Sequence, residues 1–246
     1  LFDADTGVDQ FKLHSVVALV GKRQLIRKVA FLALACGLLI ILMLAIKSNL
    51  SVLGLVICSC FLGYLYQGPP FRWGYQGLGE PLCWLAFGPF ATTASLLVIA
   101  PDSQYQNIIP WSTALILGAG PALATTLVLF CSHFHQTVQD EIHGKKTSLV
   151  RLGTKRAARL IPWFIGLIMS TEIIPIIFGR LPVTAILSCI GLPPAINLCR
   201  LLKKYHNQPK LITESKFIAL RFQWLNGLGF TLGLAITPYM GINFTN

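Results

Sequence analysis

The chain has 246 residues, of which 54% are hydrophobic and only 12% are charged. Because a soluble domain carries about 25% charged residues, this composition excludes an ordinary water-soluble protein and indicates a membrane protein. The formal net charge is +11, but the basic residues lie between apolar runs, which favours a role in membrane orientation over nucleic-acid binding. The seven cysteines lie in or beside apolar runs, without a Cys-x-x-Cys pair, and are interpreted as small hydrophobic residues.

Seven segments are apolar over about 20 residues, the length that a helix needs to cross a bilayer core. In chain order they cover roughly residues 27–46, 50–68, 82–100, 108–130, 160–178, 181–199 and 217–239. These runs are too long for strands and lack the alternation of strands. The sequence therefore predicts an all-α fold, a polytopic membrane helix bundle with seven transmembrane helices in this chain.

The basic residues of the loops fall almost entirely on alternate connections of this bundle. One set of loops holds nearly all of the Lys and Arg residues, whereas the opposite set holds only Lys47 and Arg180. Cytoplasmic loops carry such an excess of positive charge, so the basic loops are predicted to face the cytoplasm or the stroma. Most acidic residues lie in the same loops, and a site for a metal ion and a diphosphate would explain their position.

The first polar motif contains three carboxylates, Asp3, Asp5 and Asp9, followed by Lys12. Oxygen ligands of this kind suit Mg²⁺, which binds one or two carboxylates together with the phosphates of a substrate. On a helix Asp5 and Asp9 would share a face, whereas a turn at Gly7 would bring Asp3 and Asp9 together. A solvated acidic loop is the alternative interpretation.

The second polar motif covers residues 132–146 and contains three histidines. Gln136, Asp140 and His143 are spaced so that they would lie on one face of a helix. Lys145 follows, and its charge is suited to the oxygen atoms of a phosphate. A zinc site is the alternative, but two of the histidines are only two residues apart and would point away from each other on a helix.

The third polar motif, residues 64–81, is a loop rich in Gly and Pro on the basic side. The rings of its three Tyr residues are suited to stabilise a passing cation, and Arg72 is suited to bind phosphate oxygens. An aromatic belt at the membrane interface would by itself account for the Tyr and Trp residues. It would not account for the sequence Gly77-Leu-Gly79-Glu80.

One acidic residue, Glu172, lies inside an apolar run. An ionisable group at membrane depth is a candidate functional residue. The alternative is a position near the interface opposite the active face, close to Arg180, and the sequence leaves both open.

At these three motifs the sequence resembles the 1,4-dihydroxy-2-naphthoate prenyltransferases of the UbiA-type superfamily, in the cyanobacterial and plastid branch that uses phytyl diphosphate. The resemblance covers essentially the whole chain, and its most specific stretch runs from Tyr66-Gln-Gly-Pro-Pro-Phe-Arg72 to Phe87-Gly-Pro-Phe90. Two features depart from the family. The Asn-Asp pair of the first motif would precede Leu1, and Gln136 stands where the superfamily has a carboxylate, so that either metal affinity is weaker there or Glu141 compensates.

The resemblance implies a single domain over residues 1–246, lacking the first two of the family's nine helices and the start of the first Asp motif. It implies Mg²⁺-dependent transfer of a phytyl or other long prenyl group from its diphosphate to 1,4-dihydroxy-2-naphthoate, with loss of CO₂, in phylloquinone or menaquinone biosynthesis. The implied location is a cyanobacterial cell or thylakoid membrane, or a plastid membrane, with the active-site loops on the cytoplasmic or stromal side.

The resemblance also implies roles for individual residues. Asp3, Asp9 and Asp140 would hold Mg²⁺ and, with Tyr66, form the catalytic set. The residues implied to bind the two substrates are Lys12, Gln67, Arg72, Glu80, Gln136, Lys145 and Arg151.

Three alternatives remain at this point. Another UbiA-type aromatic prenyltransferase would use homogentisate or chlorophyllide as its acceptor, or a polyprenyl donor. A membrane transporter, from a different class, would use Glu172 and the acids as an ion path, but transporters hold their polar site near the membrane midplane, whereas these acids cluster in loops on one face. A non-catalytic membrane relative is the third.

Overall fold

The computed structural model describes residues 21–99 and 109–237 of the chain. Within these two ranges every regular element is a helix, which confirms the all-α prediction. The α-helices are α3 (Arg23–Lys47), α4 (Ser51–Gln67), α5 (Gly79–Leu85), α6 (Ala91–Ile99), α7 (Trp111–Ser132), α8 (Thr137–Ile142), α9 (Ser148–Leu152), α10 (Thr154–Ile177), α11 (Leu192–Tyr205) and α12 (Ser215–Ile236). The segments with 3₁₀ or π geometry are η2 (Trp73–Gln76), η3 (Ala86–Phe90), η4 (Phe134–Gln136) and η5 (Val183–Gly191).

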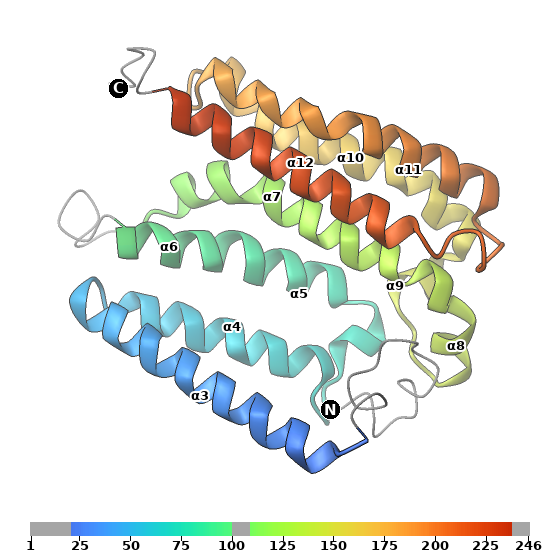
Figure 1. Cartoon of the computed structure of the whole chain (residues 1–246), viewed down its shortest axis with the longest axis horizontal. Coiled ribbons are helices and arrows are strands. Elements are labelled where there is room, and N and C mark those ends of the chain that lie inside the picture. The colour runs from blue at the N-terminus through green and yellow to red at the C-terminus, as the bar shows by residue number, and fades with distance from the viewer. Residues whose placement is uncertain (1–20, 100–108, 238–246) are drawn as a thin grey trace.

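The long helices lie side by side in a stack (Figure 1). The order runs from α3 and α4 through α5–α6 and α7 to the group of α10, α11 and α12. The short helices α8 and α9 lie together at one end of the stack. This end collects the loops that carry the second and third polar motifs.

Among residues 21–99 and 109–237, five helices are long and apolar enough to cross a membrane. They cover Gln24–Lys47, Gly79–Ile99, Trp111–Ile142, Thr154–Ile177 and Val183–Tyr205. The other two predicted segments also coincide with helices, α4 and α12, but α4 has only 17 residues and α12 carries Arg221 and Asn226. All seven predicted segments are therefore helical where the structure describes them, while the number of crossings stays a prediction.

Three predicted segments begin too late. α3 begins at Arg23 rather than near residue 27, the helix that starts with α5 begins at Gly79 rather than near residue 82, and α10 begins at Thr154 rather than near residue 160. Hydropathy marks only the apolar part of such a helix, whereas the polar residues that leave the membrane continue the same backbone hydrogen bonding. The polar ends therefore belong to the helices rather than to the loops.

The apolar side chains divide between a core and an outward surface. The main core lies between α7, α10, α11 and α12 and contains buried residues such as Leu127, Ile161 and Phe222. Outward-facing apolar side chains are numerous, with Ile46 68% exposed and Phe178 75% exposed. A helix surface of this kind is stable in lipid rather than in water, which supports the membrane assignment.

Candidate active site

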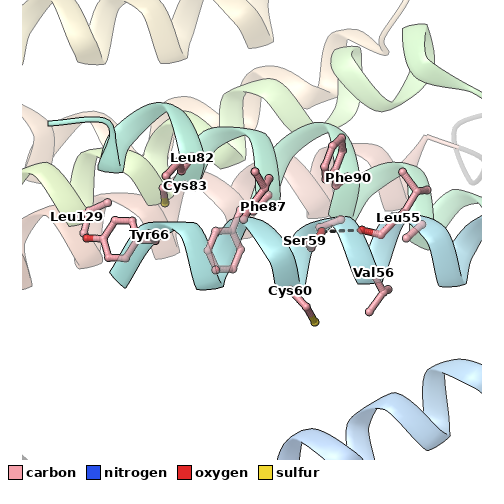
Figure 2. A pocket seen from close by; sticks show the side chains of 15 residues that line it. Leu55, Val56, Ser59, Cys60, Tyr66, Leu82, Cys83, Phe87, Phe90 and Leu129 are labelled. Carbon is pink, nitrogen blue, oxygen red and sulfur yellow. Dashed lines mark hydrogen bonds between the residues drawn. The ribbon is translucent and has the colours of Figure 1, made fainter. Parts of the chain in front are cut away.

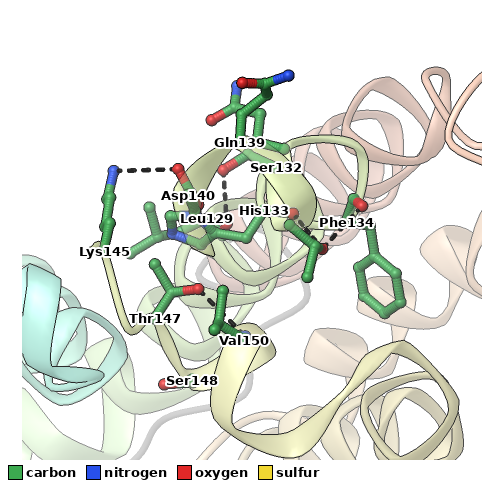
Figure 3. A network of polar contacts seen from close by, with 12 residues as sticks. Leu129, Ser132, His133, Phe134, Gln139, Asp140, Lys145, Thr147, Ser148 and Val150 are labelled. Atoms are coloured by element: carbon green, nitrogen blue, oxygen red, sulfur yellow. Dashed lines mark hydrogen bonds and ion pairs between the residues drawn. The ribbon is translucent and has the colours of Figure 1, made fainter. Parts of the chain in front are cut away.

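The polar centre of the site is Asp140 on α8, whose side chain is completely buried (Figure 3). His133 Nδ1 lies 3.3 Å from Asp140 Oδ2, and Lys145 Nζ lies 3.9 Å from Asp140 Oδ1. Oδ1 has no hydrogen-bond partner among the described residues. Because a buried carboxylate is costly unless it is paired or holds a cation, Oδ1, which faces Lys145 without a hydrogen bond, is suited to a further positive ligand.

The backbone around Asp140 forms a tight reversal at the end of α7. Phe134 is buried and packs edge to face on Phe130 of α7, with ring centroids 5.9 Å apart. After α8, Gly144 adopts a positive φ of 72°, the left-handed conformation that commonly ends a helix. The chain then turns back, and the backbone N–H of Lys145 donates to the carbonyl of Asp140 at 2.7 Å. This turn brings the Lys145 side chain to the carboxylate.

The helix of the second motif is short. α8 covers Thr137–Ile142, with Gln136 as its N-cap and His143 as its C-cap. Gln136 ends the preceding 3₁₀ turn, and its Nε2 lies 3.2 Å from His135 Nε2. That Gln136, Asp140 and His143 share one face stays a prediction.

The zinc alternative finds no support in the part of the chain that the structure describes. Within residues 21–99 and 109–237, no three or more His, Cys, Asp or Glu side chains gather as metal ligands. His133 contacts the Asp140 carboxylate, whereas His135 contacts Gln136. The described part of the site supplies one buried carboxylate, Asp140, to any cation.

The loop of the third motif is bonded to the second motif. The backbone N–H of Lys146 donates to the carbonyl of Tyr75 at 2.8 Å. The hydroxyl of Ser148, at the start of α9, donates to Glu80 Oε2 at 2.6 Å. Arg151 Nε donates to the carbonyl of Lys146 at 3.2 Å. Segments about 70 residues apart in the chain therefore form one polar surface, and the bonds of Lys146 and Ser148 hold its two halves together.

Tyr75 brings two basic side chains to this surface. Lys145 Nζ lies 5.2 Å from the centre of its ring, and Arg72 Cζ lies 5.8 Å from it. Both distances are within the range of cation–π contacts. The buried Nε of Arg72 has no hydrogen-bond partner among the described residues. Two cations around one ring, beside Asp140, form a positive site that is suited to a diphosphate.

Tyr66 lies at the inner edge of the same loop, against two glycines. A Cβ on Gly74 would lie 2.8 Å from the Tyr66 carbonyl oxygen, and one on Gly79 would lie 2.9 Å from the ring of Tyr66. No real Cβ approaches other atoms so closely, so both positions need glycine. This contact accounts for Gly79, which an interfacial aromatic belt left unexplained.

An apolar cavity of about 580 Å³ extends from Tyr66 between α4 and the α5–α6 helix (Figure 2). Tyr66 and Leu129 lie at one end of the row of labelled side chains, and Leu55 and Val56 lie at the other. At 1.5 Å per residue, the part of α4 between Tyr66 and Leu55 is about 16 Å long. The other labelled lining residues are Ser59, Cys60, Leu82, Cys83, Phe87 and Phe90. The cavity is suited to a long hydrocarbon chain.

Leu129 joins the apolar cavity to the polar centre. Its side chain lines the cavity, and its carbonyl accepts a hydrogen bond of 2.6 Å from Ser132, the residue before His133. A molecule with a long apolar tail and an anionic head therefore matches the combined site. The head would lie near Asp140 and Lys145, and the tail along α4.

Some of the predicted site residues lie outside the described part of the chain, and others lie around the site. Asp3, Asp9 and Lys12 lie outside the described residues. Asp140, Lys145, Arg72 and Tyr66 surround the polar centre or the cavity entrance, as expected of an active site, and Gln67 ends α4 beside them. Their individual roles stay predictions. The residues that sequence reasoning did not single out are His133 and Tyr75, and only their positions in polar motifs could have indicated them.

Glu172 is not part of this site. It is buried in α10, and its Oε2 accepts a hydrogen bond of 2.9 Å from Asn226 Nδ2 on α12. A Cβ on Gly120 of α7 would lie 2.6 Å from Glu172 Cγ. Glu172 therefore points into the helix bundle, and its depth in the membrane stays a prediction.

Comparison with known proteins agrees with this geometry. Residues 14–236 match the UbiA prenyltransferase family. The chain is 36% identical over 234 residues to the 2-carboxy-1,4-naphthoquinone phytyltransferase of Synechocystis sp., covering 95% of this chain and 74% of that protein. It is 38% identical over 238 residues to the chloroplastic 2-carboxy-1,4-naphthoquinone phytyltransferase of Arabidopsis thaliana, covering 96% of this chain and 62% of that protein. No solved structure gave a significant match.

These matches confirm the resemblance drawn from the three polar motifs. They also confirm the class of enzyme at the level of the family, whose members are prenyltransferases. The chain belongs to the UbiA prenyltransferase family.

Proposed function

We propose that the protein transfers a phytyl or other long prenyl group from its diphosphate to 1,4-dihydroxy-2-naphthoate, with loss of CO₂, in phylloquinone or menaquinone biosynthesis. The observation that carries the proposal is the junction of an apolar cavity with a cationic centre at Leu129. The two relatives are named as phytyltransferases of 2-carboxy-1,4-naphthoquinone, which supports this choice of donor and acceptor.

The basic side chains of the centre bind the diphosphate in this account. Lys145 and Arg72 flank Tyr75, and their charges would contact the phosphate oxygens as the bond between the prenyl C1 and its oxygen breaks. The diphosphate leaves with the electron pair, so negative charge increases on these oxygens. Fixed cations that meet developing charge stabilise the transition state.

Mg²⁺ fits at Oδ1 of Asp140, because this oxygen is buried without a hydrogen-bond partner among the described residues. Asp140 would hold the ion together with Asp3 and Asp9, which lie outside those residues. When bound, the ion would neutralise charge on the diphosphate. His133 holds the other carboxylate oxygen, Oδ2.

Tyr66 and the cavity serve the prenyl group. The ring of Tyr66, held between Gly74 and Gly79, would stabilise the allylic cation that ionisation leaves. The apolar cavity holds the tail and excludes water, which would otherwise capture the cation. The ring carbon of the naphthoate that bears the carboxylate then forms the new C–C bond. The carboxylate departs as CO₂, and its electron pair returns to the ring.

The proposal is tested with the full-length protein in membranes. The assay contains Mg²⁺, labelled phytyl diphosphate and 1,4-dihydroxy-2-naphthoate labelled at the carboxyl carbon. Prenyl naphthoquinol, which air oxidises to the quinone during extraction, and labelled CO₂ in equal amounts are expected. If product forms with homogentisate or chlorophyllide but not with the naphthoate, the proposed acceptor is wrong, whereas the assignment as a prenyltransferase still holds.

A further inference from the structure

A second polar depression lies between α10 and α11, apart from the candidate active site. It measures about 710 Å³, and none of its lining residues belongs to the cavity or the polar centre described above. The lining residues are Lys155, Ala158, Arg159, Pro162, Trp163, Cys199, Arg200, Lys203 and His206. We call it the α10–α11 groove.

The helix register brings four cations to this groove. Lys155 and Arg159 are four residues apart on α10, and Arg200 and Lys203 are three residues apart on α11. Residues at these spacings lie on one face of a helix. Because α10 and α11 pack side by side (Figure 1), the two faces meet, and His206 joins them through a 3.2 Å contact of its Nδ1 with Thr154 Oγ1.

The groove has no negative charge to balance these cations. No Asp or Glu lines it, and the only ion pairs among the described residues involve Asp140. Like charges at these helical spacings destabilise a helix. The positive-inside rule explains basic residues on this side of the membrane, but it does not require them to converge on one depression. A bound anion would offset their repulsion.

The surroundings of the groove indicate a lipid rather than a soluble anion. Trp163, which lines it, is 78% exposed, as is typical of tryptophan at the level of lipid headgroups. Along the same two helices, Leu167 is 53% exposed and Ile196 is 49% exposed. These apolar side chains would contact acyl chains directly beside the cationic groove.

We propose that the α10–α11 groove binds the phosphate headgroup of an anionic membrane lipid. Arg159, Arg200 and Lys203 contact the phosphate, and the acyl chains lie along the exposed apolar faces of α10 and α11. Basic depressions between membrane helices on the cytoplasmic side bind headgroups in this way. The proposal is independent of the reaction at Asp140.

The test uses the full-length protein in nanodiscs of equal phosphatidylcholine and phosphatidylglycerol, with bound lipids counted by native mass spectrometry. The variant combines Arg159→Gln with Lys203→Gln. Its matched control combines Arg156→Gln with Lys204→Gln, one Arg from α10 and one Lys from α11 again, both exposed and outside the groove. A conservative pair, Arg159→Lys with Lys203→Arg, and circular dichroism show whether the fold is retained.

The protein and the matched control are expected to retain phosphatidylglycerol in preference to phosphatidylcholine. The groove variant should bind phosphatidylglycerol about 30-fold more weakly, since each of the two basic residues it loses contributes about 1 kcal/mol near a membrane surface. The conservative pair should bind normally. Equal binding by variant and control would overturn the proposal. So would displacement of the lipid by millimolar inorganic diphosphate, which would identify a site for a soluble anion.

Discussion

His133 Nδ1 lies 3.3 Å from Asp140 Oδ2, and both side chains are buried. The contact fixes one carboxylate oxygen and leaves the other, Oδ1, facing Lys145. Groups that orient a ligating carboxylate influence metal affinity and rate without touching the substrate. His133 is therefore a positioning residue for Asp140.

Replacing His133 tests this role. His133→Leu removes the hydrogen bond and should lower prenyl transfer and apparent Mg²⁺ affinity by about 10- to 100-fold. His133→Asn keeps a donor near the position of Nδ1 and should recover most of the loss. The measurement is the initial rate as a function of Mg²⁺ concentration. Equal defects in both variants, with unchanged Mg²⁺ dependence, would assign His133 to packing alone.

Gly79 and Gly54 give opposite predictions for the same substitution. A Cβ on Gly79 would lie 2.9 Å from the Tyr66 ring, whereas one on Gly54 of α4 meets nothing within 4 Å. Gly79→Ala should lower stability by about 1–3 kcal/mol through overpacking and also slow prenyl transfer, because the Tyr66 ring must move. Gly54→Ala should be neutral or stabilising by about 0.5–1 kcal/mol.

Thermal unfolding in one detergent and the prenyl transfer rate check both glycine variants. If Gly79→Ala behaves like Gly54→Ala in both measurements, the contact between Gly79 and Tyr66 does not constrain the site.

The cavity along α4 predicts how donor length is limited. Val56 lines the end away from Tyr66, so Val56→Trp should shorten the chain that fits. KM for phytyl diphosphate should rise about tenfold or more, as expected when two or more methylene groups lose about 0.8 kcal/mol each, while geranyl diphosphate is little affected. Ile57→Trp is the control, because Ile57 is exposed and outside the lining. A similar change with both donors would mean that the tail lies elsewhere.

Glu172 is predicted to stabilise the bundle rather than to take part in prenyl transfer. Its Oε2 accepts a hydrogen bond from Asn226, and a Gln side chain can accept the same bond. Glu172→Gln should therefore leave the unfolding temperature nearly unchanged. Glu172→Ala should lower stability by about 1–3 kcal/mol, because the buried amide of Asn226 loses its bond to Glu172 and keeps only the longer one, 3.3 Å, to the Ser188 carbonyl.

The rate of prenyl transfer per folded molecule should be the same in the two Glu172 variants. Loss of transfer in a stable Glu172→Gln protein would reveal a functional carboxylate and contradict this assignment.

The sequence predicts the helices better than it predicts the site. Apolar runs of membrane length leave no alternative to helices, and all seven coincide with helical structure where it is described. Their polar ends were missed, as at Gly79 and Thr154, because hydropathy does not register a helix that continues into water.

The site was predicted by residue type but not by geometry. Asp140 and Lys145 were expected together, and the structure brings them to 3.9 Å. Spacing rules do not detect the interruption between α7 and α8, where the chain reverses and brings Lys145 back to Asp140. Tyr75 contacts Lys145 only because the third motif is hydrogen-bonded to the second, and such long-range pairing is not encoded in local sequence patterns.

The most direct test of the central claim compares two neighbouring carboxylates in the full-length protein. Asp140 is buried at the polar centre, whereas Glu141 is exposed. Labelled phytyl diphosphate and 1,4-dihydroxy-2-naphthoate are supplied with Mg²⁺, and the prenyl product is measured for the protein, Asp140→Asn and Glu141→Gln. The unmodified protein should form the prenyl product. Asp140→Asn should lose activity by about 100-fold or more, whereas Glu141→Gln should keep nearly full activity. Full activity in Asp140→Asn, or no product from well-folded protein with phytyl or longer donors, would contradict the central claim.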